Sequence, residues 1–204
     1  MLNRVMTHLD ALIEEAPDNV AIFIPSYKLM DEVLIRSRWS RQVIAEQPEW
    51  TKTDADGVLP RLEKARDAGR PAVLVGTYGG RLAEGMDYHA NLLCAVACIG
   101  IPIAPPSAEG DALRSYLSRS MSTGQVWNYA VIQPAINRVL QAMGRAIRKE
   151  EDRALILLID SRHLDDQHKP AHPDPSQLLT ARDASVTARL ARRFFGRDPE
   201  ALES

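Results

Sequence analysis

The sequence contains few cysteines and little net charge. Cys94 and Cys98 are the only two cysteines in 204 residues, which excludes a disulfide framework and a four-thiolate metal cluster. Both lie in the apolar run 92–99, where we expect buried, inert thiols. A formal net charge of −2 excludes the global basic field that announces many nucleic-acid-binding proteins. Nucleic acid therefore has to be bound, if at all, by local patches.

Long hydrophobic runs are missing as well. The apolar run 92–99 is the best membrane candidate, but it is too short to span a bilayer and Pro102 interrupts it. The N-terminal segment has no secretory core, because His8, Asp10 and Glu14 break its apolar pattern. We therefore expect no membrane partner and a cytoplasmic, reducing environment.

The chain instead alternates apolar runs with helical patterns. Hydrophobic residues make up 45% of the sequence and charged residues 25%, which is typical of a globular protein with one sizeable core. Strands are expected at 20–24, 41–45, 71–77, 92–101 and 154–159. Helices are expected at 2–13, 27–38, 56–68, 108–119, 134–149 and 186–195. Uniformly apolar strands between helices predict an α/β fold with a parallel sheet covered on both faces.

Two parts of the chain are expected to differ in character. Residues 1–163 carry the alternating pattern, and residues 164–204 are predicted to form a polar loop followed by a short basic C-terminal helix. The helix carries Arg189, Arg192 and Arg193, which could contact DNA or dock on the domain. No internal repeat or linker is present, so we expect a single domain with a tail.

The predicted helix 134–149 carries an unusual polar stripe. At about 100° per residue, its apolar side chains fall within one arc of about 60°. That arc contains Ile136, Leu140, Met143 and Ile147. Gln141, Arg145 and Arg148 fall in a second arc on nearly the opposite side. Guanidinium forks suit phosphate oxygens because they are planar, bidentate and always charged. The alternative is a solvated basic face.

Three loops follow predicted strands. In the first, Ser26, Tyr27 and Lys28 open a helix, where backbone N–H groups, a hydroxyl and a lysine can together hold a phosphate; an ordinary capped helix is the alternative. The second, 77–87, has three glycines that permit close approach of a ligand to the backbone. No Lys-Ser/Thr pair follows it, so it is not a phosphate-binding P-loop. The third loop, 100–106, is proline-rich and interpreted as structural.

Taken in order, these segments resemble the second motor domain of superfamily 2 DNA helicases of the XPD/Rad3/DinG type. The resemblance runs from about residue 19 to residue 163. Segment 23–27 is similar to motif IV, segment 79–87 to motif V, and segment 141–148 to motif VI of that family. Segments 99–102 and 157–162 are similar to the stretches that follow motifs V and VI. Ala83 stands where the family more often has serine. The resemblance implies a RecA-like parallel sheet with helices on both faces.

The resemblance also implies a role for each motif in binding nucleotide. Arg145 and Arg148 would be arginine fingers that reach the γ-phosphate of ATP, and Gln141 would contact the same phosphate or its attacking water. Residues of the 79–87 segment would line the nucleotide side of the cleft, touching ribose or steadying the arginines. These residues are Glu84, Gly85 and Asp87.

The DNA side is implied in the same way. Ser26, Tyr27, Gly79, Gly80 and Arg81 would contact the phosphates of single-stranded DNA. Family resemblance also suggests DNA repair as the setting of that activity.

Half of the motor is missing from the sequence. It has no Gly-x-Gly-Lys-Thr segment, no Asp-Glu-x-His segment and no four-cysteine iron–sulfur region. We therefore expect ATP and Mg²⁺ to be bound mainly by a first motor domain, which is an implied partner, and the chain to be inactive alone. The alternatives are a non-enzymatic nucleic-acid- or partner-binding module with the same fold, and a self-sufficient enzyme using the Glu84 and Asp87 loop.

The tail offers a rival site. His163, His168 and His172 lie near several aspartates, and imidazoles with carboxylates can bind a metal. No zinc-binding spacing is present, so the segment is predicted to be an unconstrained polar loop without a metal.

Overall fold

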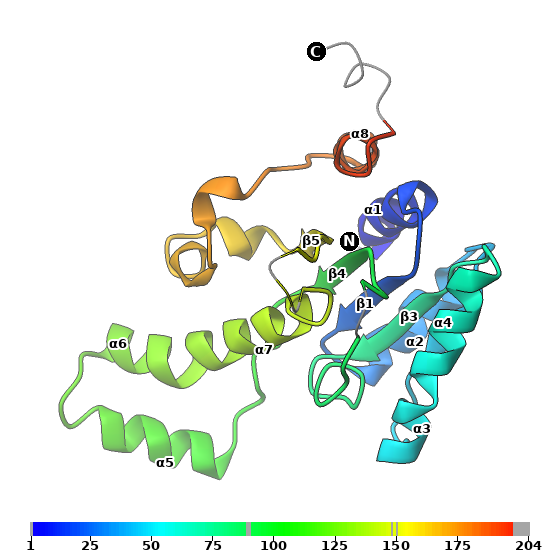
Figure 1. The fold of residues 1–204 in the computed structure, drawn as a ribbon. Helices are drawn as coiled ribbons and strands as arrows, with labels where there is room; N and C mark the ends of the chain where they lie inside the picture. Colours follow the sequence, from blue (N-terminus) through cyan, green and yellow to red (C-terminus); the bar gives the residue numbers. More distant parts are fainter. Residues whose placement is uncertain (1, 89–90, 148, 150, 198–204) are drawn as a thin grey trace.

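Five parallel strands form the centre of the computed structural model, which describes residues 2–88, 91–147, 149 and 151–197 (Figure 1). The strands are β1 (Val20–Ile24), β2 (Val43–Ala45), β3 (Val73–Thr77), β4 (Ala95–Ile99) and β5 (Leu155–Ile159), in the order β2-β3-β1-β4-β5. In the central pair, Ile24 lies opposite Thr77. The carboxyl ends of all five strands therefore meet at one edge of the sheet.

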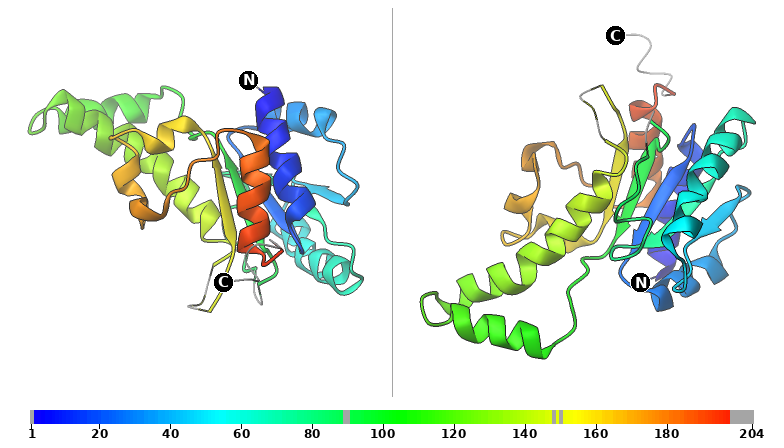
Figure 2. Two further views of the ribbon diagram at one scale, coloured as in Figure 1. Left: turned by 90° about the horizontal axis from the view of Figure 1, so that it is seen from above. Right: turned by 60° about the horizontal axis from the view of Figure 1, so that its bottom comes forward.

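Helices cover both faces of this sheet (Figure 2). On one face lie α1 (Leu2–Glu15), α2 (Tyr27–Arg36) and α8 (Ala184–Phe194), and on the other lie α3 (Lys52–Asp56), α4 (Val58–Asp67) and α7 (Gln133–Met143). Residues of β1 alternate between the two cores: Ile22 packs into the first and Phe23 into the second. Because each face needs an apolar side chain, the strand is apolar throughout. The predicted α/β architecture is confirmed.

Buried Asn19 joins several segments at the amino-terminal edge of the sheet. Its Nδ2 donates to the carbonyl oxygens of Leu62 and Leu92, each at 3.1 Å, and its Oδ1 accepts from the Ala72 N–H at 2.7 Å. Its side chain is 0% exposed. One amide therefore connects the start of β1 with α4 and with the chain entering β3 and β4.

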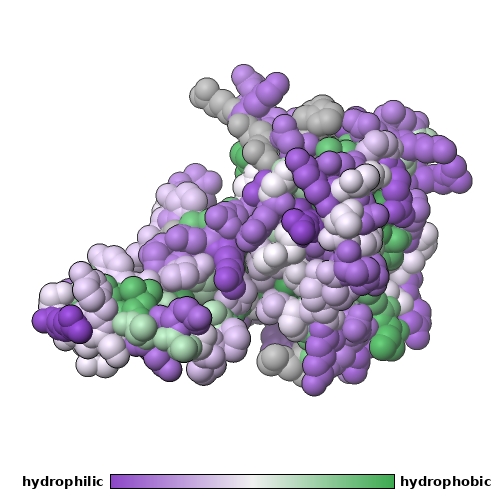
Figure 3. Space-filling model, turned by 90° about the horizontal axis from the view of Figure 1, so that it is seen from below, coloured by the Kyte–Doolittle hydropathy of each residue, from purple (hydrophilic) through white to green (hydrophobic). Residues whose placement is uncertain are grey.

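A helical arm extends away from the sheet between β4 and β5 (Figure 1). It consists of α5 (Ala108–Leu117), α6 (Thr123–Trp127) and the π-helical turn η1 (Asn128–Ile132), which runs directly into α7. None of the α5 side chains is buried. Hydrophobic patches lie among hydrophilic ones on the projecting arm (Figure 3).

The helix predicted at 134–149 has wrong boundaries at both ends. It is already helical from Thr123, because η1 accommodates Pro134, which lacks an N–H and would crowd a regular α-turn. In that wide turn the Gln133 N–H donates five residues back, to Asn128. The helix ends at Met143, where Gly144 caps it with a tightened turn.

The prediction of a polar stripe on one helix face is wrong, because α7 ends at Met143, before Arg145. Arg145 lies in the turn after the helix, and Ile147 is 44% exposed instead of packed in the core. Gln141 remains on α7, where it is exposed. Arg148 lies outside the described residues. The helix predicted at 56–68 is likewise shorter, as α4, and α3 precedes it.

The segment after β5 is more ordered than predicted. It folds into three short 3₁₀ turns, η2 (Ser161–Leu164), η3 (Lys169–Ala171) and η4 (Pro175–Gln177). His163, His168 and His172 are all buried, and His163 Nδ1 lies 3.1 Å from His172 Nε2. The prediction of an unconstrained polar loop is therefore wrong. These turns fold back so that the imidazole rings pack inside.

Helix α8 docks on the domain. It lies beside α1 (Figure 2), places Ala191 in the core, and pairs Arg192 with Glu15 at 2.7 Å. Arg189 and Arg193 are exposed on its other side. Docking on the domain is therefore what the structure shows for Arg192, while the division of the chain at 163/164 stays a prediction. In the described part of the chain, no helix is long and apolar enough to cross a membrane.

Candidate functional site

The predicted site residues of two loops meet at the carboxyl edge of the sheet. Ser26 and Tyr27 follow β1, and residues 79–81 follow β3, its direct neighbour. The Tyr78 N–H donates to the Ile24 carbonyl at 3.2 Å, which fixes the two loops against each other. Ligands of open α/β sheets bind outside the carboxyl ends of the strands.

Helix α2 begins at this edge with a side-chain cap. The exposed Ser26 hydroxyl accepts a hydrogen bond from the Leu29 N–H at 3.3 Å, as the sequence predicts for an N-cap. The Tyr27 side chain next to it is half-buried, and burial raises the pKa of its hydroxyl, which lies close enough to Thr77 and Glu46 for both to act on that pKa. The cap leaves Ser26 at the surface and turns Tyr27 toward the glycine loop, defined here as residues 77–87.

Two buried tyrosines anchor the glycine loop. The Tyr78 hydroxyl donates to the carbonyl oxygens of Ile99 and Gly100, each at 3.2 Å. The Tyr88 hydroxyl donates to the Leu82 carbonyl at 3.0 Å. Burial raises the pKa of both phenols above its usual value, so both remain neutral donors. The loop is thus held from its first and its last turn.

Predicted ligand-contacting residues project from this anchored loop. Arg81, Glu84 and Asp87 are exposed. Gly85 has φ +81°, a left-handed conformation that glycine adopts without strain. The loop therefore turns sharply between its two acidic side chains and presents both to solvent.

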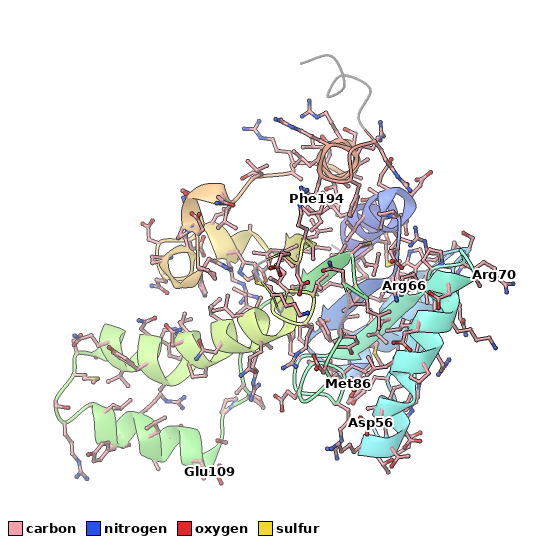
Figure 4. All side chains as sticks on the ribbon, viewed as in Figure 1. Asp56, Arg66, Arg70, Met86, Glu109 and Phe194 are labelled. Carbon is pink, nitrogen blue, oxygen red and sulfur yellow. The ribbon has the colours of Figure 1, made fainter. Side chains whose placement is uncertain are left out.

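Arg145 contacts the same loop, although it lies 59 residues after Met86 in the sequence. Its Nη1 donates to the Met86 carbonyl at 2.8 Å, and its guanidinium lies close enough to Tyr88 to act on that phenol electrostatically. Met86 marks the loop in Figure 4. The structure thus brings Arg145 together with residues 84–87, as predicted, although Arg145 comes from a turn rather than from a helix face.

Glu46 is a site residue that the sequence analysis missed. It follows β2 directly and its side chain is 0% exposed. Its carboxylate accepts hydrogen bonds from the N–H groups of Thr77 at 3.1 Å and Arg81 at 2.5 Å. Burial raises its pKa, and these backbone donors oppose that shift. The signal that could have found it is an acidic residue directly after a predicted strand, at the edge where the other loops meet.

The two cysteines lie at opposite ends of β4, with Cys98 beside the Tyr78 hydroxyl, and the three histidines of the tail follow β5. Burial raises the pKa of Cys94 to about 11 and of Cys98 to about 12, so both thiols are protonated at neutral pH; Cys98 is buried as predicted, whereas Cys94 is only half-buried. Within the described residues, no group of three or more His, Cys, Asp or Glu side chains is arranged to hold a metal ion.

Comparison with known proteins identifies the family. A model of the helicase C-terminal domain matches residues 9–174. The chain belongs to this family.

Helicase C-terminal domains of this type occur in much longer proteins. Over 174 residues the chain is 32% identical to the ATP-dependent DNA helicase chl-1 of Caenorhabditis elegans, covering 79% of this chain and 20% of that protein. It is 31% identical over 166 residues to the ATP-dependent DNA helicase XPD of Sulfolobus acidocaldarius, covering 79% of this chain and 28% of that protein. The chain therefore spans less than a third of either relative.

Solved structures give the same result. The structure titled "XPD_Helicase" matches with a TM-score of 0.67 and 28% identity, covering 84% of this chain and 30% of that one. "XPD_APO" matches with a TM-score of 0.67 and 29% identity, covering 84% and 34%. The RecA-like fold and the resemblance to the XPD/Rad3 type are confirmed. The roles of the individual residues in the helicase C-terminal domain stay predictions.

Proposed function

We propose that this helicase C-terminal domain is the second motor domain of an ATP-dependent DNA helicase. It completes the ATP site of a first motor domain and holds one DNA strand. The hydrogen bond from Arg145 to the Met86 carbonyl carries the proposal. It ties an arginine of the motif VI segment to the glycine loop whose opposite end carries Gly79, Gly80 and Arg81.

On the nucleotide side, the proposal assigns charge stabilisation to the arginines. Arg145 and Arg148 neutralise the charge that develops on the γ-phosphate of ATP, and Gln141 contacts that phosphate or its attacking water. The half-buried position of Arg145 and its bond to Met86 limit the reorganisation needed to meet the phosphate. ATP and Mg²⁺ are bound mainly by the first motor domain, and residues 84–87 line this side of the cleft.

On the DNA side, the proposal assigns contacts to the phosphate backbone. The exposed Ser26 hydroxyl, the Tyr27 side chain, the backbone of Gly79 and Gly80, and the exposed Arg81 guanidinium all offer groups that suit phosphate oxygens. Such contacts position a strand without reading its sequence. With a net charge of only −2 on the whole chain, affinity depends on this local cluster and falls with added salt.

A chimera tests the proposal. This chain replaces the matching region of Sulfolobus acidocaldarius XPD, and phosphate release is measured with and without single-stranded DNA. Arg145→Ala should lower the DNA-stimulated rate by about 10³–10⁵-fold, the usual value of an arginine finger. The rate of the Arg145→Lys chimera should lie between the rates of the unmodified and the Arg145→Ala chimeras, because lysine keeps the charge but loses the planar fork. Arg138→Ala removes an exposed arginine from α7 and serves as the control.

The outcomes separate the two leading functions. DNA-stimulated hydrolysis that survives Arg145→Ala contradicts the arginine-finger role. A folded chimera that binds single-stranded DNA without hydrolysing ATP supports the non-enzymatic binding module instead. Thermal unfolding of each variant shows whether a lost activity reflects a lost fold.

A further inference from the structure

The buried carboxylate of Glu46 lies beneath the glycine loop and binds its backbone. Glu46 lies beyond the end of β2, yet its side chain reaches under the chain that follows β3. It accepts hydrogen bonds from the N–H groups of Thr77 and Arg81. Two backbone donors from one short loop thus converge on a single side chain that comes from more than thirty residues earlier.

One glycine of the loop, Gly80, is explained by this carboxylate. A Cβ atom on Gly80 would overlap both carboxylate oxygens of Glu46, and one on Gly76 would lie 2.9 Å from its Oε2. By contrast, a Cβ on Gly79 would meet no atom within 4 Å. Gly80 is not among the described glycines that have a positive φ, so a left-handed turn does not require glycine at this position. Glycine is required there for the close approach of the backbone to Glu46.

The same carboxylate also reaches the first loop. The Tyr27 hydroxyl lies close enough to Thr77 and Glu46 for both to act on its pKa, so the start of α2, the end of β2 and the glycine loop meet around this carboxylate. Burying an ionised carboxylate is unfavourable unless hydrogen bonds replace its water. Here backbone N–H groups supply those bonds, and the loop is thereby fixed in one path.

We propose that Glu46 is a positioning residue that sets the path of residues 77–82, so that Arg81 and the glycine backbone present one preformed surface to a DNA phosphate. This inference rests on the proposed function, in which that loop contacts DNA. Glu46 itself is buried and touches no DNA. Its contribution is to remove the loop's conformational freedom before binding, which binding would otherwise have to remove.

Removing the acceptor tests the role. Binding of a fluorescent oligothymidylate at low salt is measured by anisotropy, well below the unfolding temperature of each variant. Glu46→Gln keeps the size of the side chain but turns one acceptor into a donor facing a donor. We expect roughly tenfold weaker binding, the equivalent of ordering about one residue. Glu49→Ala, which removes an exposed carboxylate nearby, should not weaken the binding, because the loss of a negative charge there cannot repel a phosphate.

A double variant separates positioning from stability. Gly80→Ala should destabilise the protein strongly, because its new methyl group overlaps the carboxylate. Glu46→Ala combined with Gly80→Ala removes that overlap, so stability should recover relative to Gly80→Ala alone. The affinity for DNA should not recover, because the loop is no longer held. A merely structural role predicts that affinity and stability recover together.

Each result has a distinct meaning. If the unmodified chain binds DNA and Glu46→Gln binds equally well, Glu46 does not position the loop, and the proposed function is untouched. If the unmodified chain does not bind DNA even at low salt, the DNA part of the proposed function fails and takes this inference with it. Recovery of DNA affinity in the double variant overturns the inference alone.

Discussion

Replacing Asn19 by alanine should destabilise the whole domain, although Asn19 lies far from the candidate site. The side chain is 0% exposed and makes three hydrogen bonds to backbone groups. Those groups belong to Leu62, Ala72 and Leu92, which lie 43, 53 and 73 residues away in the sequence. Asn19→Ala removes all three bonds at once and leaves a small cavity.

The loss of unfolding free energy depends on which hydrogen bonds the three backbone groups keep when the Asn19 side chain is removed. The Ala72 N–H loses its acceptor in a buried position, which costs about 1–3 kcal/mol. Leu62 lies inside α4 and its carbonyl keeps a place in the helical ladder, so its loss is smaller. Adding the Leu92 carbonyl gives a total of about 3 kcal/mol, a large part of the 5–15 kcal/mol that stabilises a typical domain.

Urea unfolding followed by tryptophan fluorescence measures this loss. The midpoint should fall while the slope of the transition stays the same, because the surface exposed on unfolding is unchanged. Asn19→Asp should be no better, since a carboxylate cannot donate to the two carbonyls. Asn137→Ala is the control, because Asn137 is exposed and its side chain accepts a hydrogen bond from Gln133 of the same helix. A loss below about 1 kcal/mol for Asn19→Ala would refute the reasoning.

Two further predictions concern the tail and the glycine loop. Burial and the neighbouring His172 lower the pKa of His163 to about 4, so the unfolded chain binds more protons than the folded one between that value and the ordinary one. Stability should be complete above about pH 6.5 and be lost as pH falls toward about 4, by about 2 kcal/mol at pH 5. In His163→Gln the pH dependence measured by urea unfolding should be reduced but not abolished, because burial lowers the pKa of His172 too; an unchanged profile would contradict the assignment. Gly85→Ala should cost about 1–2 kcal/mol through its φ of +81° alone, since no atom crowds the new methyl group. Gly124→Ala in α6 is its control and should be neutral or stabilising, and equal losses in the two variants would argue against backbone strain at Gly85.

Local signals in the sequence predicted most of the fold. Each strand is a short apolar run because both of its faces are buried. Ser26 caps α2 through a hydrogen bond to Leu29, only three residues away in the sequence. Such features depend on neighbours in the chain. The same dependence misled the prediction at Pro134, which is typical of a first helical turn but here follows a π-helical turn inside a longer helix.

Contacts between distant segments could not be predicted in this way. Asn19 looks like the end of a helix, Glu46 like a polar residue after a strand, and His163 like part of a surface loop. The structure buries all three, because each meets partners brought together only by the fold. For the candidate site, the motif residues could be placed on the right edge of the sheet, whereas the carboxylate beneath the loop could not.

The bond between Arg145 and the Met86 carbonyl makes the glycine loop a mechanical link under the proposed function. The first residues of the loop face the DNA and its last residues bind Arg145, so a displacement at one end of the loop is transmitted to the other. A nucleotide that shifts Arg145 also shifts the Met86 end of the loop through this bond, and so changes the contacts of the loop with the strand. Linkage then demands the reverse with equal free energy: a bound strand shifts the affinity for nucleotide by the same factor.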